Sequence, residues 1–194
     1  MRYANSVEGF DNLLLSTKRN GISNLISWLH TTDFYTAPAS TKYHGCEERG
    51  LIYHSLTVYD CAKDLEGSLI SADIKMPYDI IVISALLHDI CKVNSYELYL
   101  KNVKVTNPDG SYTWEQQPAY KFNEEFKFGG HGSKSVYLAS KYINLTDAEA
   151  VAINCHMGFS NERNISPIAE AFTAYPLAWL IHVADEMSTF IYCT

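Results

Sequence analysis

The sequence predicts an all-α fold, a helical bundle interrupted by one β-hairpin near residues 96–122. Apolar residues recur at helical spacing, as in Ile22, Leu25, Ile26 and Leu29. Strand-like sequence gathers on either side of a single strong turn signal. Proline or threonine at helix-start positions precedes several of the apolar segments.

The bulk composition fits one globular domain over residues 1–194. The chain is 47% hydrophobic and 13% aromatic, which is typical of a folded protein with a substantial core. Its formal net charge of −7 argues against broad nucleic-acid binding, which needs basic surface. No apolar stretch reaches the roughly 18 residues that a membrane-spanning helix requires.

Two short helices are expected first, over residues 7–16 and 21–30, with Gly21 between them. Residues 33–42 contain proline and small side chains, which favour a loop. A third helix is expected from about residue 50 to residue 64, because apolar and small residues recur there on one face.

The next predicted helix carries the most apolar run of the chain. Pro77 fits its first turn, and the Asp79 charge is favourable near a helix N-terminus. The run over residues 80–87 leads directly into His88 and Asp89, where we expect the helix to end.

A change of pattern then predicts the hairpin. Residues 96–100 and 103–105 are strand-like, the turn signal lies at 107–110, and β-rich sequence resumes at 111–114. The hairpin tyrosines and Trp114 could stack on a nucleobase, or they could serve as core or as a contact between copies of the chain.

Helix is expected again near His131, over residues 134–142. Thr146 and Glu149 have the spacing of a capping box, which predicts a further helix to about His156.

The C-terminal part is expected to hold a loop over residues 161–166 and a last apolar helix. Pro176 opens this helix, which spans residues 177–191 and contains His182 and Asp185.

The adjacent pair His88-Asp89 is the main candidate for chemistry. An imidazole and a carboxylate at the end of an apolar helix are costly to bury unless something compensates them. A divalent cation is the natural compensation, since both groups are ordinary metal ligands. The pair could not share one face in the middle of a helix, but near a helix end both side chains can reach one ion.

Other histidines and aspartates complete two candidate ligand sets. The first set comprises His54, His88, Asp89 and Asp185. A neighbouring ion could be held by His131 and His156, with Asp89 bridging. Two ions about 3.5–4 Å apart would clamp the attacking and leaving oxygens of a phosphoryl transfer and activate a water as hydroxide. This donor set suits one or two ions of Mn, Fe, Co, Ni, Mg or catalytic Zn.

Positively charged and polar groups beside the pair are candidate substrate contacts. Lys92 lies one turn after His88-Asp89, where its ammonium could bind a phosphate oxygen and act in catalysis together with Asp89. His44 could face the site from the preceding loop, and Arg49 could add positive charge at its mouth. His182 is expected to lie in the core or behind the ligands.

Five segments together resemble the HD-domain metal-dependent phosphohydrolase superfamily. They are Gly50–Leu56, Ala85–Lys92, His131–Ser135, Cys155–Gly158 and His182–Asp185, and the likeness runs from about residue 44 to residue 194. The chain is most similar to the branch with extra histidines, which includes exoribonuclease-type and phosphodiesterase domains. The resemblance implies a helical bundle, hydrolysis of phosphoesters and the six metal ligands named above. Cys91 departs from the pattern, since the family often has glycine there, and Arg49-Gly50 replaces a Gly-Gly pair.

The sequence therefore favours a hydrolase that cleaves a phosphoester bond in a nucleotide or another small phosphate ester. One alternative is a nuclease or cyclic-nucleotide phosphodiesterase with the same site, and another is a non-catalytic sensor that binds metal and nucleotide. We expect a small phosphorylated partner, no membrane, no long nucleic acid and a possible homo-oligomer. Five scattered cysteines without a Cys-x-x-Cys pair suit a reduced, cytoplasmic setting.

Overall fold

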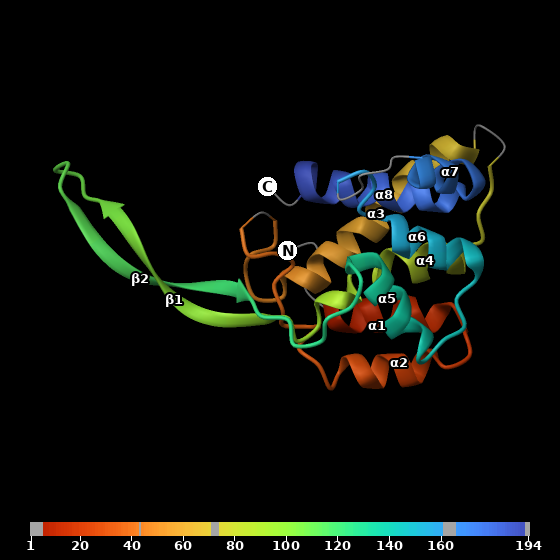
Figure 1. Ribbon diagram of the computed structural model, residues 1–194, viewed down its shortest axis with the longest axis horizontal. Helices are drawn as coiled ribbons and strands as arrows, with labels where there is room; N and C mark the ends of the chain where they lie inside the picture. The colour runs from red at the N-terminus through yellow and green to blue at the C-terminus, as the bar shows by residue number, and fades with distance from the viewer. Residues whose placement is uncertain (1–5, 43, 71–73, 161–165, 193–194) are drawn as a thin grey trace.

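The all-α prediction is confirmed by the computed structural model, which describes residues 6–42, 44–70, 74–160 and 166–192. Eight α-helices and one two-stranded antiparallel sheet lie within these ranges (Figure 1). The helices are α1 (Ser6–Ser16), α2 (Ile22–Leu29), α3 (Gly50–Ile70), α4 (Tyr78–Leu87), α5 (His131–Ser140), α6 (Asp147–Cys155), α7 (Ser166–Ala174) and α8 (Pro176–Met187). A 3₁₀ turn, η1 (Ile90–Lys92), follows α4, and a π-helical turn, η2 (Ser188–Tyr192), follows α8. The strands are β1 (Tyr96–Thr106) and β2 (Tyr112–Phe122).

Helix α3 runs through the middle of the bundle and contacts α1, α4 and α8 (Figure 1). Its predicted buried face is confirmed, with Leu51, Ser55, Val58 and Ala62 inaccessible to solvent. One apolar cluster joins this helix to α1, α2 and α4, and a second joins it to α6 and α8. Both faces of α4 are therefore covered, which explains why its sequence is apolar all round.

The hairpin projects from the helical body as a long arm (Figure 1). Its strands pair without interruption from Tyr96↔Phe122 to Thr106↔Tyr112. At the base, the Tyr96 hydroxyl donates to the Ala39 carbonyl at 3.0 Å. Farther out Trp114 is 64% exposed, so the outer aromatic residues are not part of the core of this chain. Contact with another copy of the chain stays a prediction.

The capping box at the start of α6 is confirmed. Thr146 accepts from the Glu149 backbone N–H, and the Glu149 side chain accepts from the Thr146 N–H. The same Glu149 carboxylate pairs with Arg19, which also donates to Asp79 Oδ2 at 2.9 Å. One arginine thus connects the start of α4 with the start of α6.

The boundaries differ from the expectations where packing outweighs local sequence. Helix α3 continues past residue 64 because Leu65 and Leu69 pack on the second apolar cluster. Helix α7 was not predicted from the sequence, which indicated only a loop over residues 161–166 before the last helix. Residues 161–165 of that loop lie outside the described residues. Helix α5 begins at His131 instead of residue 134. Among the described helices, none is long and apolar enough to span a membrane.

Gly132 marks the closest approach between α5 and α6. A Cβ atom built there would lie 2.2 Å from the Asn154 carbonyl oxygen. Any larger side chain must push the two helices apart, and the two helices carry His131 at the start of α5 and His156 at the end of α6.

We expect Gly132→Ala to lower the free energy of unfolding by about 1–3 kcal/mol, because the added methyl overpacks this contact. The matched control is Gly9→Ala on α1, where a Cβ atom would meet nothing within 4 Å. That change should be neutral or should stabilise by roughly 0.5–1 kcal/mol. Urea unfolding of both variants checks this, and equal effects would contradict the close approach.

Candidate metal centre

The end of helix α4 explains how two consecutive residues reach one site. His88 caps the helix after Leu87 and still has helical geometry, whereas Asp89 leaves it with φ −113° and ψ 16°. The following turn is held in place because the Cys91 N–H donates to Ser135 Oγ on α5 at 3.1 Å. The break in the helix turns the Asp89 carboxylate toward the His88 ring, with Oδ2 3.4 Å from His88 Nε2.

The first predicted ligand set converges. His54 Nε2 lies 3.1 Å from His88 Nε2 and 3.1 Å from Asp185 Oδ1. Asp89 Oδ2 lies 3.6 Å from His54 Nε2, and His88 Nε2 lies 4.0 Å from Asp185 Oδ1. The four donors come from α3, the end of α4 and α8, and only Asp185 keeps appreciable exposure, at 13% of its side chain.

These separations match the edges of a coordination polyhedron. With metal–ligand bonds of about 2.1 Å, neighbouring ligand atoms lie about 3.0 Å apart at right angles and about 3.4 Å apart in a tetrahedron. His54, His88 and Asp185, whose donor atoms lie 3.1–4.0 Å apart, therefore leave room for one cation. Asp89 Oδ2 lies 3.4–3.6 Å from both histidine nitrogens of this group.

The hydrogen bonds behind the histidines leave their inner nitrogens free. His88 donates from Nδ1 to the Ala85 carbonyl at 2.8 Å, and His156 donates from Nδ1 to the Ile153 carbonyl at 2.7 Å. In the neutral rings each Nε2 then carries a lone pair directed into the cluster. His54 Nε2 contacts Asp185, and its Nδ1 lies 3.1 Å from Ser188 Oγ. If a cation takes the place of a proton on Nε2, the Nδ1–H can donate to the Ser188 hydroxyl.

A second set of donors surrounds the other oxygen of Asp89. Its Oδ1 lies 3.6 Å from His156 Nε2 and 3.9 Å from Cys91 Sγ. His131 joins this set, since suitable donor atoms of Asp89, Cys91 and His131 all lie within 4.8 Å of one another. The carboxylate therefore has one oxygen in each set, the arrangement that a bridging ligand requires.

Most of the chain matches one known protein family. The HD domain family matches residues 51–188, which is more than half of the chain. The chain belongs to the HD domain family. No curated protein matched the chain, and no solved structure did. HD domains are generally metal-dependent phosphohydrolases, and the buried histidine and aspartate groups of this HD domain could bind a metal ion.

The two carboxylates of the candidate site, Asp89 and Asp185, both have pKa values below the usual one for aspartate. Burial alone would raise the pKa of Asp89, but Lys92 and His88 outweigh burial and hold that pKa well below its usual value. Burial likewise opposes ionisation of Asp185, and the hydrogen bond from His54 outweighs it and lowers the pKa of Asp185. Both carboxylates contact the His54 and His88 rings, and a bound cation would offset their two negative charges.

Histidine protonation responds to the same charges. Burial would lower the pKa of His88, but the neighbouring Asp89 carboxylate outweighs burial and raises it. For His54 burial dominates and lowers the pKa. In the metal-free protein His88 is therefore the histidine of this set whose proton competes most directly with a cation.

Lys92 lies within the cluster, with its Nζ 2.6 Å from Asp89 Oδ2. Burial opposes its charge, yet Asp89 outweighs burial and raises the pKa of Lys92. The ammonium also lines the adjoining cavity, so it can neutralise Asp89 and face a bound ligand at once.

A cavity of about 500 Å³ opens beside the two donor sets. Six of the predicted site residues line it, namely His44, His54, Asp89, Lys92, His131 and Asp185. Tyr96, one of the hairpin tyrosines considered for base stacking, and Met157 after α6 also line it. Phe122 from the hairpin base and Thr189 and Phe190 from η2 complete the wall, and the sequence did not single out these three.

Of the other residues predicted to lie at or near the site, the structure brings some to it and not others. His44 lies at the site, with its ring centroid 4.6 Å from that of His54. Arg49 is not brought to the cavity, because its guanidinium donates to Ser6 Oγ at 2.6 Å and lies over the Tyr53 ring. His182 stands behind the ligands as expected, since its Nδ1 donates to the His156 carbonyl at 2.8 Å. Ser188 was missed, although its position three residues after Asp185 places it on the same helical face.

We expect saturating Mn²⁺ to raise the melting temperature of the EDTA-treated protein, since a ligand that binds only the folded state at 100 times its Kd stabilises it by about 2.7 kcal/mol. Asp89→Asn should abolish most of this increase. His30→Gln is the matched control, because His30 is a surface residue paired with Asp11. Differential scanning calorimetry gives the comparison. An equal metal response in both variants would contradict the assignment.

We also expect metal affinity to rise with pH between 6 and 8. His88, with its raised pKa, must lose its proton to bind a cation, so metal binding releases protons and each proton released gives up to about tenfold in affinity per pH unit. Calorimetric titrations in two buffers of different ionisation enthalpy count these protons. An affinity that stays constant over this range would contradict the role of His88.

Proposed function

We propose that this HD domain is a metal-dependent phosphohydrolase that cleaves a phosphoester bond in a nucleotide or another small phosphate ester. The observation that carries the proposal is the Asp89 carboxylate, with one oxygen in each of two histidine-containing donor sets beside a cavity. A purely structural metal site would be closed by its ligands, whereas catalytic sites keep an open side.

The residues present fit divalent cations. His54, His88, Asp89 and Asp185 would hold one, and Asp89, His131 and His156 would hold a second. A bound cation supplies Lewis acidity and an activated water for attack on phosphorus. The protein contributes the fixed orientation of the imidazoles, through the backbone carbonyls of Ala85 and Ile153 that hold their outer nitrogens.

Lys92 and His44 are the proposed substrate contacts. The Lys92 ammonium already lies on Asp89 and faces the cavity, so a phosphate oxygen can bind it without a large movement. Burial lowers the pKa of His44 to about 4, so near neutral pH its ring is uncharged and can donate one hydrogen bond. Neither ring nitrogen of His44 has a hydrogen-bond partner among the described residues.

The cavity supports a small substrate over a polymer. Its volume of about 500 Å³ is within the range of small-molecule sites, and Tyr96, Phe122 and Phe190 offer surfaces for a planar base. The hairpin does not form a basic groove, because Lys101, Lys104 and Lys121 are balanced by Glu97, Asp109 and Glu115. A nuclease is therefore less well supported. The open cavity beside the donors also favours an enzyme over a sensor.

We expect hydrolysis of one or more nucleotides or phosphodiesters when the purified protein is screened with Mn²⁺, Co²⁺, Ni²⁺ and Mg²⁺. Lys92→Ala should lower kcat by about 10²–10³ while leaving metal binding detectable, because it removes a charge that stabilises the transition state. Lys101→Ala on the exposed hairpin is the control and should retain full activity. The proposal fails if the protein binds metal but no phosphoester is cleaved, or if Lys92→Ala is fully active.

A further inference from the structure

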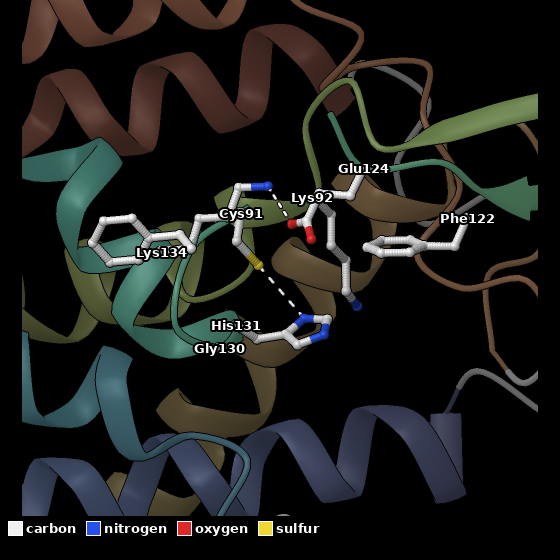
Figure 2. A pocket seen from close by; sticks show the side chains of 8 residues that line it. Cys91, Lys92, Phe122, Glu124, Gly130, His131 and Lys134 are labelled. Atoms are coloured by element: carbon white, nitrogen blue, oxygen red, sulfur yellow. Dashed lines mark hydrogen bonds and ion pairs between the residues drawn. The ribbon is translucent and has the colours of Figure 1, made fainter. Parts of the chain in front are cut away.

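The second donor set of this chain contains a thiol. A smaller cavity of about 200 Å³ lies between the hairpin base and the start of α5. Figure 2 shows Cys91, Lys92 and His131 among the side chains that line it. The Cys91 sulfur points toward the His131 ring, and Sγ lies 3.7 Å from Nδ1 (Figure 2).

The distances around this sulfur resemble ligand-to-ligand distances. Cys91 Sγ lies 3.7 Å from His131 Nδ1 and 3.9 Å from Asp89 Oδ1, and the same oxygen lies 3.6 Å from His156 Nε2. With bonds of about 2.3 Å to sulfur and about 2.1 Å to nitrogen or oxygen, the edges of a tetrahedron around zinc are about 3.4–3.6 Å. The donor atoms of Asp89, Cys91 and His131 all lie within 4.8 Å of one another, and His156 Nε2 approaches the same Asp89 oxygen.

His156 supplies an independent sign that a ligand belongs here. Its side chain is completely buried, and its Nε2 has no hydrogen-bond partner among the described residues. The Nδ1 hydrogen bond to the Ile153 carbonyl leaves this nitrogen as an acceptor in the neutral ring. A buried acceptor without a donor is costly, and coordination of a cation would satisfy it.

A role in packing alone explains the cysteine poorly. A buried cysteine usually behaves as a small apolar side chain. Cys61 does so, since it belongs to the apolar cluster of α3 and α8. The Cys91 sulfur instead faces an imidazole and a carboxylate, which are fellow ligands of a thiolate in zinc sites.

We propose that Cys91 is a ligand of the second cation, together with Asp89 Oδ1, His131 and His156, and that this position prefers zinc or a similar thiolate-binding cation to magnesium or manganese. Binding replaces the S–H bond by a sulfur–metal bond, and the thiol proton passes to solvent. Soft thiolate ligands favour such cations, whereas the first set has only nitrogen and oxygen donors. The inference rests on the proposed function, because it concerns the second metal position of the same site.

Cobalt titration of the EDTA-treated full-length protein tests this, because Co²⁺ bound to a thiolate shows a sulfur-to-metal charge-transfer band in the near ultraviolet. We expect the band in the wild-type protein and in Cys61→Ser, the matched buried control, and its loss in Cys91→Ser. Competition with zinc should show at least a tenfold weaker affinity at one of the two positions in Cys91→Ser, since loss of even a supporting group of a metal site typically costs about 10–100-fold. Cys91→Ala provides a second variant if the serine protein does not fold.

The outcomes separate this inference from the proposed function. Cobalt binding without the charge-transfer band, or a band that persists in Cys91→Ser and Cys91→Ala, would overturn the role of Cys91 and leave the first metal position intact. The absence of any cobalt or zinc binding to the wild-type protein would overturn both.

Discussion

The whole site depends on the buried carboxylate of Asp89. It lies among three imidazoles and one ammonium, where an ionised group is stable only if positive charge surrounds it. Lys92 supplies one such charge, but Asp185 adds a second carboxylate to the same cluster. The histidines cannot all compensate by protonation, because burial lowers the pKa of His54. A bound cation would resolve this conflict, because the histidine Nε2 atoms of the cluster could bind it.

The fold serves this constraint by bringing the donors together from distant parts of the chain. His54 comes from the central helix α3, Asp185 from α8, and His131 and His156 from the contact between α5 and α6. The tight approach at Gly132 and the hydrogen bond from His182 to the His156 carbonyl fix the second set. The first set is held by Ser188 and by the end of α4. The geometry of the site therefore depends on the packing of the helical bundle.

Much of this could be predicted from sequence. The hairpin, the capping box of Thr146 and Glu149, and the convergence of His54, His88, Asp89 and Asp185 follow from turn chemistry, capping and the cost of buried polar groups. The end of α3 could not be predicted, because Leu65 and Leu69 extend the helix by packing on the second apolar cluster. Helix α7, which begins at Ser166, could not be predicted because its apolar pattern is weak. The location of Arg49 could not be predicted either, since Ser6, which accepts from its guanidinium, becomes a neighbour only in the folded chain.

The proposed role of the Cys91 thiol could not be predicted from the sequence. In the sequence it is one of five scattered cysteines, and only the structure places its sulfur beside His131 and Asp89. The hairpin is the opposite case, since its strands are evident from sequence, yet only its base reaches the cavity. Specificity for a small substrate would then depend on Tyr96 and Phe122, and the outer arm would be free for another role.

The most direct test of the central claim is the position of bound cations in crystals grown with Mn²⁺ or Zn²⁺, located by anomalous diffraction. The bridging role of Asp89 predicts two peaks about 3.5–4 Å apart, one on each carboxylate oxygen, with His54, His88 and Asp185 around the first and His131 and His156 around the second. Cations found only at surface carboxylates, with the Asp89 cluster free of anomalous signal, would contradict the account.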